Sequence, residues 1–275
     1  MIPKKMHYCW FGRGKKPEIV EKCIESWKLY CPDFEIIEWN EDNFDVNSHP
    51  FMKEAYENKK WAFVVDVARL LIIQEHGGVY LDTDVELFGA IDDWLNDESV
   101  FFFESIIYMN LGMGFSAVQN HPLLQKLIDS YTKIAENYSG NIDFKNYVSP
   151  PLNTEVILNC HPEIVMDGNI SQRGERIFIL AVEDYSKYAI HYGSSTWVEG
   201  PLGSGDRTRS RISELIQSKM QNPKIFQFIK KYLGERCFKL YVFMAYDFFD
   251  SGILYFVKRI LHRIERKFEI KSDKK

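Results

Sequence analysis

The sequence predicts a single α/β domain with a mostly parallel central sheet, followed by a C-terminal helical extension. Three observations carry this prediction: a strand, helix and strand open the chain, an apolar helix later runs straight into an apolar strand, and further strands accompany an amphipathic helix. Strands that alternate with helices are typical of parallel sheets, because each crossover helix packs on a face of the sheet.

The first predicted unit occupies about the first forty residues. The apolar run KKMHYCWFG (4–12) is a predicted strand that ends at a glycine. In the next segment, Val20, Ile24 and Trp27 recur at helical spacing. DFEIIEWN (33–40) then follows as a second predicted strand.

The middle of the chain holds a mostly apolar predicted helix, WAFVVDVARLLIIQEHGG (61–78), which Gly77 and Gly78 end. The helix delivers the chain into a predicted strand, VYLDTDV (79–85). The later predicted elements are the strands VFFFE (100–104), GMGFSAV (112–118) and RIFILAVE (176–183), and the helix HPLLQKLIDSYTKIAEN (121–137).

Composition describes a folded globular protein of 275 residues, 45% apolar and 15% aromatic. The N-terminal stretch is too polar for a secretory signal, so we expect the product to stay in the cytoplasm. The cysteines are odd in number and include no C-x-x-C pair, which favours packing roles over disulfides or zinc binding. They are Cys9, Cys23, Cys31, Cys160 and Cys237.

The formal net charge of −5 is unevenly distributed. Residues 223–275 hold thirteen Lys and Arg against six Asp and Glu, so this segment carries +7 and residues 1–222 carry −12. We therefore predict a catalytic domain over 1–222 and a basic tail over 223–275. The acidic body argues against nucleic acid as a partner, because phosphate backbones require clustered cations.

The tail predicts two amphipathic helices. One apolar face includes Ile225, Phe228, Ile229, Tyr232 and Leu233, and the other includes Ile253, Phe256, Val257, Ile260, Leu261 and Ile264. Neither run reaches the roughly 18 apolar residues that a membrane-spanning helix needs. Two interpretations stay open: packing on the domain or on another subunit, and attachment to an anionic membrane face.

Asp82 and Asp84 end the predicted strand 79–85. Side chains at i and i+2 of an extended strand point the same way, so the two carboxylates converge and repel unless a cation lies between them. Mg²⁺ or Mn²⁺ would take such oxygen ligands and leave positions for phosphate oxygens. The alternative is a pair of turn aspartates that cap a helix or face solvent.

Asp66 and Arg69 lie three residues apart on the apolar helix, hence on one face. Burying such a pair costs several kcal/mol per ion, which favours a functional reason. Contact with the polar part of a ligand and a structural salt bridge are the two interpretations.

Three segments in order resemble glycosyltransferase family 32, whose D-x-D sugar-binding region is shared with the yeast initiating mannosyltransferase and the clostridial glucosylating toxins. They are IPKKMHYCWFG (2–12), FVVDVARLLIIQEHGGVYLDTDV (63–85) and AIHYGSSTW (189–197), and the resemblance covers about residues 1–200. It implies a GT-A fold, a Rossmann-like sheet that binds a nucleotide-sugar donor with a divalent metal, Mn²⁺ or Mg²⁺.

The resemblance also implies roles for individual residues. Asp82 and Asp84 hold the metal, the diphosphate and the ribose, while Asp66 and Arg69 contact the donor sugar and the nucleotide. Trp10 packs near the nucleobase, unless it is an ordinary core residue.

The segment 189–197 departs from the family pattern, because Thr196 stands where the family has serine before Trp197. His191 and Ser195 are the remaining metal ligands that the resemblance implies, and Trp197 is a donor contact. Asn110 is expected to line the donor pocket. Acceptor contacts are expected near Asn153 and Thr154, in a segment where the family has a turn.

The predicted chemistry assigns catalysis to Asp82, Asp84 and Arg69, which offset the charge of the departing diphosphate. No residue stands out as nucleophile or base. Glycosidase carboxylates flank the scissile bond about 5–9 Å apart, which two near neighbours on one strand cannot do, so transfer fits better than hydrolysis. The resemblance implies retention at the anomeric carbon.

The predicted activity is hexose transfer from a UDP-sugar, with GDP-mannose as a second candidate donor, to a saccharide acceptor. A lipid-linked oligosaccharide of bacterial capsule or surface polysaccharide synthesis, held at the inner face of the cytoplasmic membrane, is the expected acceptor. A non-catalytic subunit of a membrane-associated assembly is the alternative. An aspartate-dependent phosphatase fits poorly, because Glu86 stands where that signature has Thr or Val.

Overall fold

The computed structural model describes residues 1–105, 108–138, 140 and 142–193. The predicted boundary at 222, the tail, Ser195, Thr196 and Trp197 lie outside the described residues. The strands are β1 (Lys5–Cys9), β2 (Glu35–Trp39), β3 (Gly78–Tyr80), β4 (Val85–Leu87), β5 (Ser99–Phe102), β6 (Phe115–Ala117), β7 (Gln172–Gly174), β8 (Ile177–Leu180) and β9 (Ala189–His191). The helices are α1 (Glu18–Tyr30), α2 (Pro50–Glu57), α3 (Trp61–His76), α4 (Pro122–Asn137), α5 (Ser149–Cys160) and α6 (Val182–Tyr185), with 3-10 turns η1 (Asp92–Leu95) and η2 (Phe144–Asn146).

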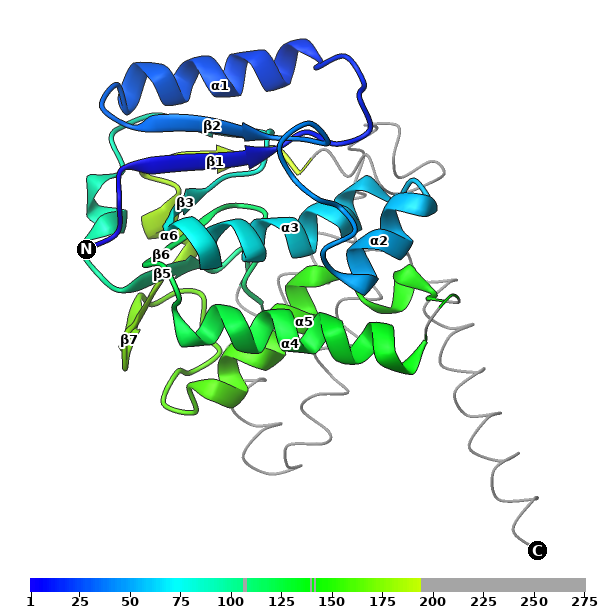
Figure 1. Cartoon of the computed structure of the whole chain (residues 1–275). Coiled ribbons are helices and arrows are strands. Elements are labelled where there is room, and N and C mark those ends of the chain that lie inside the picture. Colours follow the sequence, from blue (N-terminus) through cyan, green and yellow to red (C-terminus); the bar gives the residue numbers. More distant parts are fainter. Residues whose placement is uncertain (106–107, 139, 141, 194–275) are drawn as a thin grey trace, which may run out of the picture. The chain divides into compact units, whose positions relative to one another are not determined.

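Seven of these strands form one mixed sheet in the order β2-β1-β3-β6-β5-β8-β7 (Figure 1). β1 pairs parallel with β2 and β3, and β5 pairs parallel with β8. β6 and β7 run antiparallel to their neighbours. The α/β class with a largely parallel sheet is therefore confirmed, and the two antiparallel strands are details that hydrophobic patterning did not reveal.

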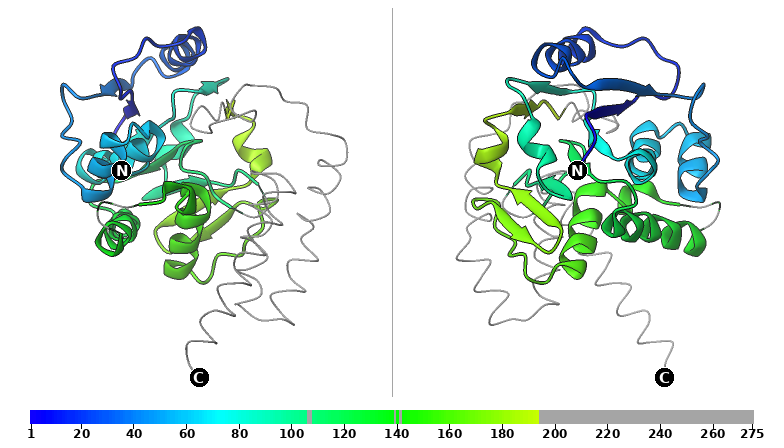
Figure 2. Two further views of the ribbon diagram at one scale, coloured as in Figure 1. Left: turned by 90° about the vertical axis from the view of Figure 1, so that its right-hand side faces the viewer. Right: turned by 60° about the vertical axis from the view of Figure 1, so that its left-hand side comes forward.

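Alternating strand residues divide the interior into two cores. In β5, Val100 and Phe102 belong to one core, while Phe101 faces the other. The helices α2 to α5 cover the Phe101 face, and α1, β4 and η1 cover the opposite face (Figures 1 and 2). The inner strands β5 and β8 read as nearly continuous apolar runs because both faces of the sheet are buried there.

The turn between α3 and β3 sets the direction of β3, the strand that precedes Asp82 and Asp84. Gly77 has φ of +63°, and a Cβ there would lie 2.9 Å from the backbone nitrogen of Gln119. His7 of β1 is wholly buried beside this turn, with Nε2 3.0 Å from the Gly77 carbonyl oxygen. Glycine is required here by its free backbone and by lack of space, which explains the helix end predicted at Gly77.

Two local predictions were wrong, and one helix was not predicted. The predicted strand 79–85 is broken, because β3 ends at Tyr80 and β4 pairs antiparallel with β9 in a separate two-stranded sheet. The segment 149–156 is the start of α5, since Pro150 and Pro151 occupy its first turn, where they need no amide hydrogen bond. The segment between β2 and α3 contains α2, whose N-terminus is capped by His49.

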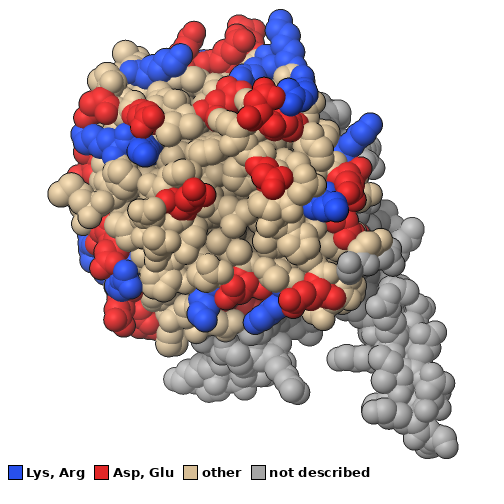
Figure 3. Space-filling model, in the orientation of Figure 1, with Lys and Arg blue, Asp and Glu red and all other residues tan. Residues whose placement is uncertain are grey.

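The surface in Figure 3 mixes both signs of charge. On the described part of this face, Lys and Arg alternate with Asp and Glu, and no continuous basic patch forms. None of the helices in the described part of the chain is long and apolar enough to cross a membrane.

Candidate active site

Asp82 and Asp84 lie in a turn after β3, not in an extended strand. The Val85 amide donates to the Asp82 carbonyl at 3.1 Å and closes this turn. The Asp82 amide donates to the Gly112 carbonyl at 3.2 Å, which ties the turn to the loop before β6. The two carboxylates therefore converge through turn geometry, and the strand argument for their convergence was wrong.

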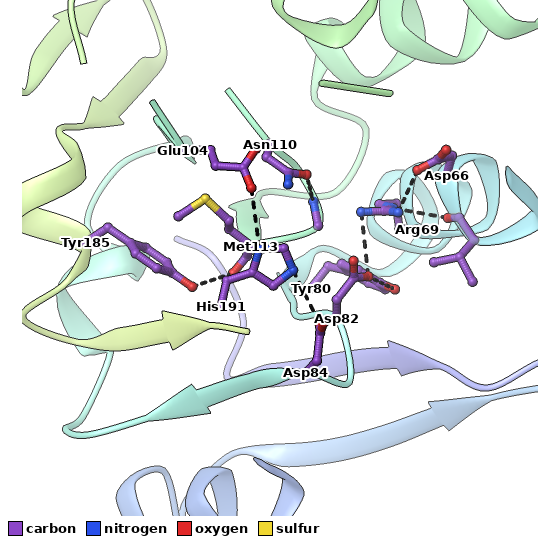
Figure 4. Close-up of polar contacts among 12 residues, drawn as sticks. Asp66, Arg69, Tyr80, Asp82, Asp84, Glu104, Asn110, Met113, Tyr185 and His191 are labelled. Carbon is purple, nitrogen blue, oxygen red and sulfur yellow. Dashed lines mark hydrogen bonds and ion pairs between the residues drawn. The ribbon is translucent and has the colours of Figure 1, made fainter. Parts of the chain in front are cut away.

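His191 completes a three-residue cluster with these aspartates. β9 places His191 opposite Val85 in the β4–β9 ladder. Its Nε2 lies 3.2 Å from Asp84 Oδ1 (Figure 4). One ligand atom from each of Asp82, Asp84 and His191 lies within 4.8 Å of the others. The structure thus brings together three of the four predicted metal ligands, while Ser195 lies outside the described residues.

The donor set of this cluster fits a divalent cation. Carboxylate oxygens suit Mg²⁺ and Mn²⁺, whereas an imidazole nitrogen suits transition metals and is an unusual partner for Mg²⁺. Two carboxylates and one imidazole leave coordination positions for water and phosphate oxygens. Of the two predicted metals, Mn²⁺ therefore fits the side chains better.

Asp66 and Arg69 form a buried ion pair behind Asp82. The two residues are 6% and 4% exposed, and Arg69 Nη2 lies 2.6 Å from Asp66 Oδ1. Arg69 Nη1 lies 3.6 Å from Asp82 Oδ1, and the guanidinium stands over the Tyr80 ring at 5.3 Å (Figure 4). In this arrangement Arg69 touches the D-x-D turn itself, and the predicted contact of the pair with the donor stays a prediction.

One nitrogen of this arginine is unusual. Among the described residues, Arg69 Nη1 is buried and makes no hydrogen bond. A buried donor without an acceptor costs about 1–3 kcal/mol, so the position is unfavourable unless another group satisfies it. Beside Asp82, the site therefore contains a buried hydrogen-bond donor without an acceptor.

Burial sets the ionisation of the acids around Arg69. It raises the pKa of Asp66 to about 6, although the charge of Arg69 works in the opposite direction. Burial also raises the pKa of Asp82 above its usual range, again against the charge of Arg69. The Tyr80 hydroxyl donates to Asp82 Oδ1 at 2.9 Å and favours the carboxylate. A bound cation would lower both pKa values by Coulomb attraction.

The ionisation of His191 follows from two acids. Burial lowers the pKa of His191, but hydrogen bonds and charge from Asp84 and Glu104 outweigh it and raise this pKa to about 10. Without a metal, the imidazolium is therefore the counterion of these carboxylates.

The loop between β5 and β6 closes the other side of the turn. Asn110 Oδ1 accepts the Gly112 amide at 2.8 Å. A Cβ on Gly112 would lie 2.5 Å from Asp82 Oδ2 and 3.3 Å from Arg69 Nη1. Asn110, predicted to line the donor pocket, thus shapes the loop that abuts Asp82.

The remaining predicted residues lie in different settings. Trp10 directly follows β1, is half-buried, and donates from its indole nitrogen to the Gly14 carbonyl at 2.7 Å, so it is not part of either buried core. Asn153 and Thr154 are 1% and 2% exposed within α5, and Thr154 Oγ1 accepts the Met109 amide at 2.8 Å. Both residues lie in a helix and not in the expected turn, and acceptor contacts near them stay a prediction.

Sequence reasoning missed three residues of the site: Tyr80, Glu104 and Gly112. Tyr80 stands two residues before Asp82, and Glu104 is an acid directly after the buried run of β5. The same pattern of a charge at a strand end had singled out Asp82, so Glu104 could have been found. Gly112 carried no signal of its own, because its role depends on a contact across the fold.

The region around the D-x-D turn matches a known protein family. Residues 17–101 match the family model described as the glycosyltransferase sugar-binding region containing DXD motif. The resemblance to glycosyltransferase family 32 is confirmed. The matched residues include α3, Asp66, Arg69 and both aspartates of the turn.

A curated relative extends this family 32 likeness beyond the matched region. Inositol phosphoceramide mannosyltransferase 3 of Schizosaccharomyces pombe is 26% identical over 220 residues, which cover 74% of this chain. The chain spans 57% of the length of that relative.

One solved structure agrees with the fold. PaToxG Glycosyltransferase matches with a TM-score of 0.50 at 15% identity, over 58% of this chain and 70% of the other. This likeness confirms the predicted GT-A fold. A glycosyltransferase involved in glycosylation of the major capsid of PBCV-1 matches at a TM-score of 0.40 and 12% identity, over 71% of this chain and 95% of its own. This second likeness is weaker.

Proposed function

We propose that this chain is a metal-dependent glycosyltransferase that moves a hexose from a nucleotide-sugar to a saccharide acceptor. One observation carries the proposal: Asp82 and Asp84, inside the region that matches the D-x-D family model, converge with His191 into a cluster with divalent-cation ligand chemistry. The cluster follows β3, and ligands of open α/β sheets bind beyond the carboxyl ends of such strands.

The side chains divide the proposed work. Asp82, Asp84 and His191 would hold the cation, which when bound supplies Lewis-acid stabilisation of the departing diphosphate. Arg69, 3.6 Å from Asp82, fixes that carboxylate and adds positive potential behind it. No base is assigned; we propose retention through attack on the same face of the sugar, with the leaving phosphate accepting the proton of the acceptor hydroxyl.

The proposed donor is a UDP-hexose, with GDP-mannose as the second candidate. The named activity of the yeast relative, mannosyl transfer, supports mannose as the sugar to test beside glucose and galactose. The proposed acceptor is a lipid-linked oligosaccharide of bacterial capsule or other surface polysaccharide synthesis, and the proposed location is the cytoplasmic face of the membrane.

The decisive experiment combines ligand binding with turnover. The full chain is heated with Mn²⁺, with Mg²⁺, and with each metal plus UDP or GDP. A ligand that binds only the native state raises the melting temperature, so Mn²⁺ with one nucleoside diphosphate is expected to do so. Slow hydrolysis of one sugar donor from a panel, stopped by EDTA, then identifies the donor. A chain that ignores both metals and every nucleotide would instead be a non-catalytic subunit.

The membrane part of the proposal depends on the basic tail. Deleting residues 223–275 is expected to reduce cosedimentation with vesicles containing anionic lipid, because each cation near such a surface contributes about 1 kcal/mol. Recovery with neutral vesicles serves as the control. Equal recovery of the truncated and full-length chains with anionic vesicles would refute the membrane role.

A further inference from the structure

His191 contacts two carboxylates that come from different parts of the fold. Its Nε2 lies 3.2 Å from Asp84 Oδ1, and its Nδ1 lies 3.7 Å from Glu104 Oε1 (Figure 4). Asp84 belongs to the cluster of possible metal ligands, whereas Glu104 does not. Nε2 therefore faces a possible metal ligand, whereas Nδ1 faces a carboxylate outside the cluster.

The backbone alone does not orient this ring. The β4–β9 ladder sets His191 opposite Val85, and the Tyr192 amide donates to the Asp84 carbonyl at 3.0 Å, so the main chain is fixed beside the turn. The torsion that turns an imidazole about its Cβ–Cγ bond is broad and roughly two-fold. Either nitrogen could then face Asp84 unless a further contact selects one.

Glu104 is placed to make that selection. It follows β5, where the Phe103 amide donates to the Leu180 carbonyl at 3.0 Å and the Glu104 amide donates to the Tyr108 carbonyl at 3.1 Å. Phe103 is wholly buried and anchors the segment, while the Glu104 side chain is 33% exposed and reaches the rim of the site. A carboxylate held there by the main chain can fix the ring without belonging to the core.

We propose that Glu104 is a positioning residue that accepts a hydrogen bond from the Nδ1–H of His191 and so presents Nε2 to the cation held with Asp82 and Asp84. The inference rests on the proposed function. A histidine ligand binds metal through one nitrogen, and the partner of the other nitrogen fixes the tautomer and the ring orientation. At 3.7 Å, a small rotation of the ring or of the carboxylate would bring Nδ1 and Oε1 within hydrogen-bond distance.

Mn²⁺ binding to the full chain, followed by electron paramagnetic resonance without any sugar donor, tests this role. Glu104→Ala is expected to weaken Mn²⁺ binding by about 10–100-fold. The nitrogen coupling of His191 to bound Mn²⁺ should weaken as well. Glu104→Gln, which keeps an oxygen acceptor, should restore most of the affinity. Glu136→Ala, which removes an exposed carboxylate from α4, is the matched control and should bind Mn²⁺ as the unchanged chain does.

A double variant separates positioning from direct ligation. If Glu104 acts through the ring, His191→Ala combined with Glu104→Ala should bind Mn²⁺ no more weakly than His191→Ala alone. If the fold losses in Mn²⁺ affinity of the two single variants multiply in the double variant, Glu104 acts on the metal independently of His191. That result would overturn the inference. Thermal unfolding without metal checks folding. Glu104→Met, similar in length without an acceptor, replaces the alanine variant should that variant not fold.

Two failures are distinguishable. An unchanged chain that binds Mn²⁺ with nitrogen coupling, beside a Glu104→Ala variant of equal affinity and coupling, would reject the positioning role alone. An unchanged chain that binds no Mn²⁺ would reject the proposed metal dependence, and the positioning role with it.

Discussion

Asp82 is fixed from several directions at the scale of single residues. The Tyr80 hydroxyl and Arg69 approach Oδ1 at 2.9 and 3.6 Å, and a Cβ on Gly112 would lie 2.5 Å from Oδ2. Asp84, in contrast, contacts His191 from the adjacent two-stranded sheet. The two carboxylates therefore have different surroundings, although the sequence presents them as an equivalent pair.

Replacing either aspartate tests the site at this scale. Asp82→Asn or Asp84→Ala is expected to lower turnover by about 10²–10³-fold or more, because the charge that holds the cation is lost. Donor hydrolysis at saturating Mn²⁺ measures this loss. Asp84→Ala should still unfold in one cooperative transition in EDTA, at lower stability than the unchanged chain, because it loses the ion pair with His191. An active variant of either kind would refute the assignment.

At the scale of elements, the site depends on the loop between β5 and β6. The Asp82 amide donates to the Gly112 carbonyl, and the Gly112 amide donates to Asn110 Oδ1. One backbone hydrogen bond therefore joins this loop to the D-x-D turn, and the Asn110 side chain fixes the loop itself. The convergence of the ligands is a property of two connected segments, not of one strand end.

Gly112→Ala tests this packing. The added methyl group would meet Asp82 Oδ2 at 2.5 Å and Asn110 Oδ1 at 2.9 Å, so the carboxylate must move. Because a displacement of about 1 Å at a catalytic group can cost about 10²-fold, we expect a loss of that order in turnover. Gly89→Ala is the matched control, since its Cβ would have no atom within 4 Å. Equal turnover of the two variants would show that the loop tolerates the methyl group.

At the scale of the whole molecule, buried neutral histidines link stability to pH. His7 is wholly buried at the centre of the β2-β1-β3 part of the sheet, where Nε2 meets the Gly77 carbonyl and Nδ1 accepts the Trp39 indole at 3.0 Å. Burial lowers the pKa of His7 from about 6.5 to about 4. Charging this ring therefore opposes the native state.

The sign of the resulting pH dependence is set by proton binding. Between about pH 4 and 6.5 the unfolded chain holds a proton at His7 and the native chain does not, so stability falls as pH falls through this window. The full shift corresponds to about 3 kcal/mol, and lowering the pH from 7.5 to 5 should cost about 2 kcal/mol at this residue. Urea unfolding at several pH values measures this loss of stability. His7→Gln, which keeps a donor for the Gly77 carbonyl, should lose the part of the pH dependence that comes from His7. An identical pH dependence of the unfolding free energy in both chains would contradict the prediction.

The sequence by itself determined the class of the fold and the identity of the central site residues. Hydrophobic periodicity depends on the nearest neighbours along the chain, and it located β1, α1, β2, α3 and α4. Asp66, Arg69, Asp82 and Asp84 stood out because charges in apolar runs are costly to bury.

Only the tertiary structure decided how the site is assembled. The break of the predicted strand at Tyr80, the helical state of 149–156 and the antiparallel placement of β6 depend on contacts between distant segments. The contributions of Tyr80, Glu104 and Gly112 have the same origin, because hydrogen bonds and steric contacts across the fold have no periodic signature in the chain. His191 needed both sources: the resemblance named it, and the β4–β9 ladder brought it to Asp84.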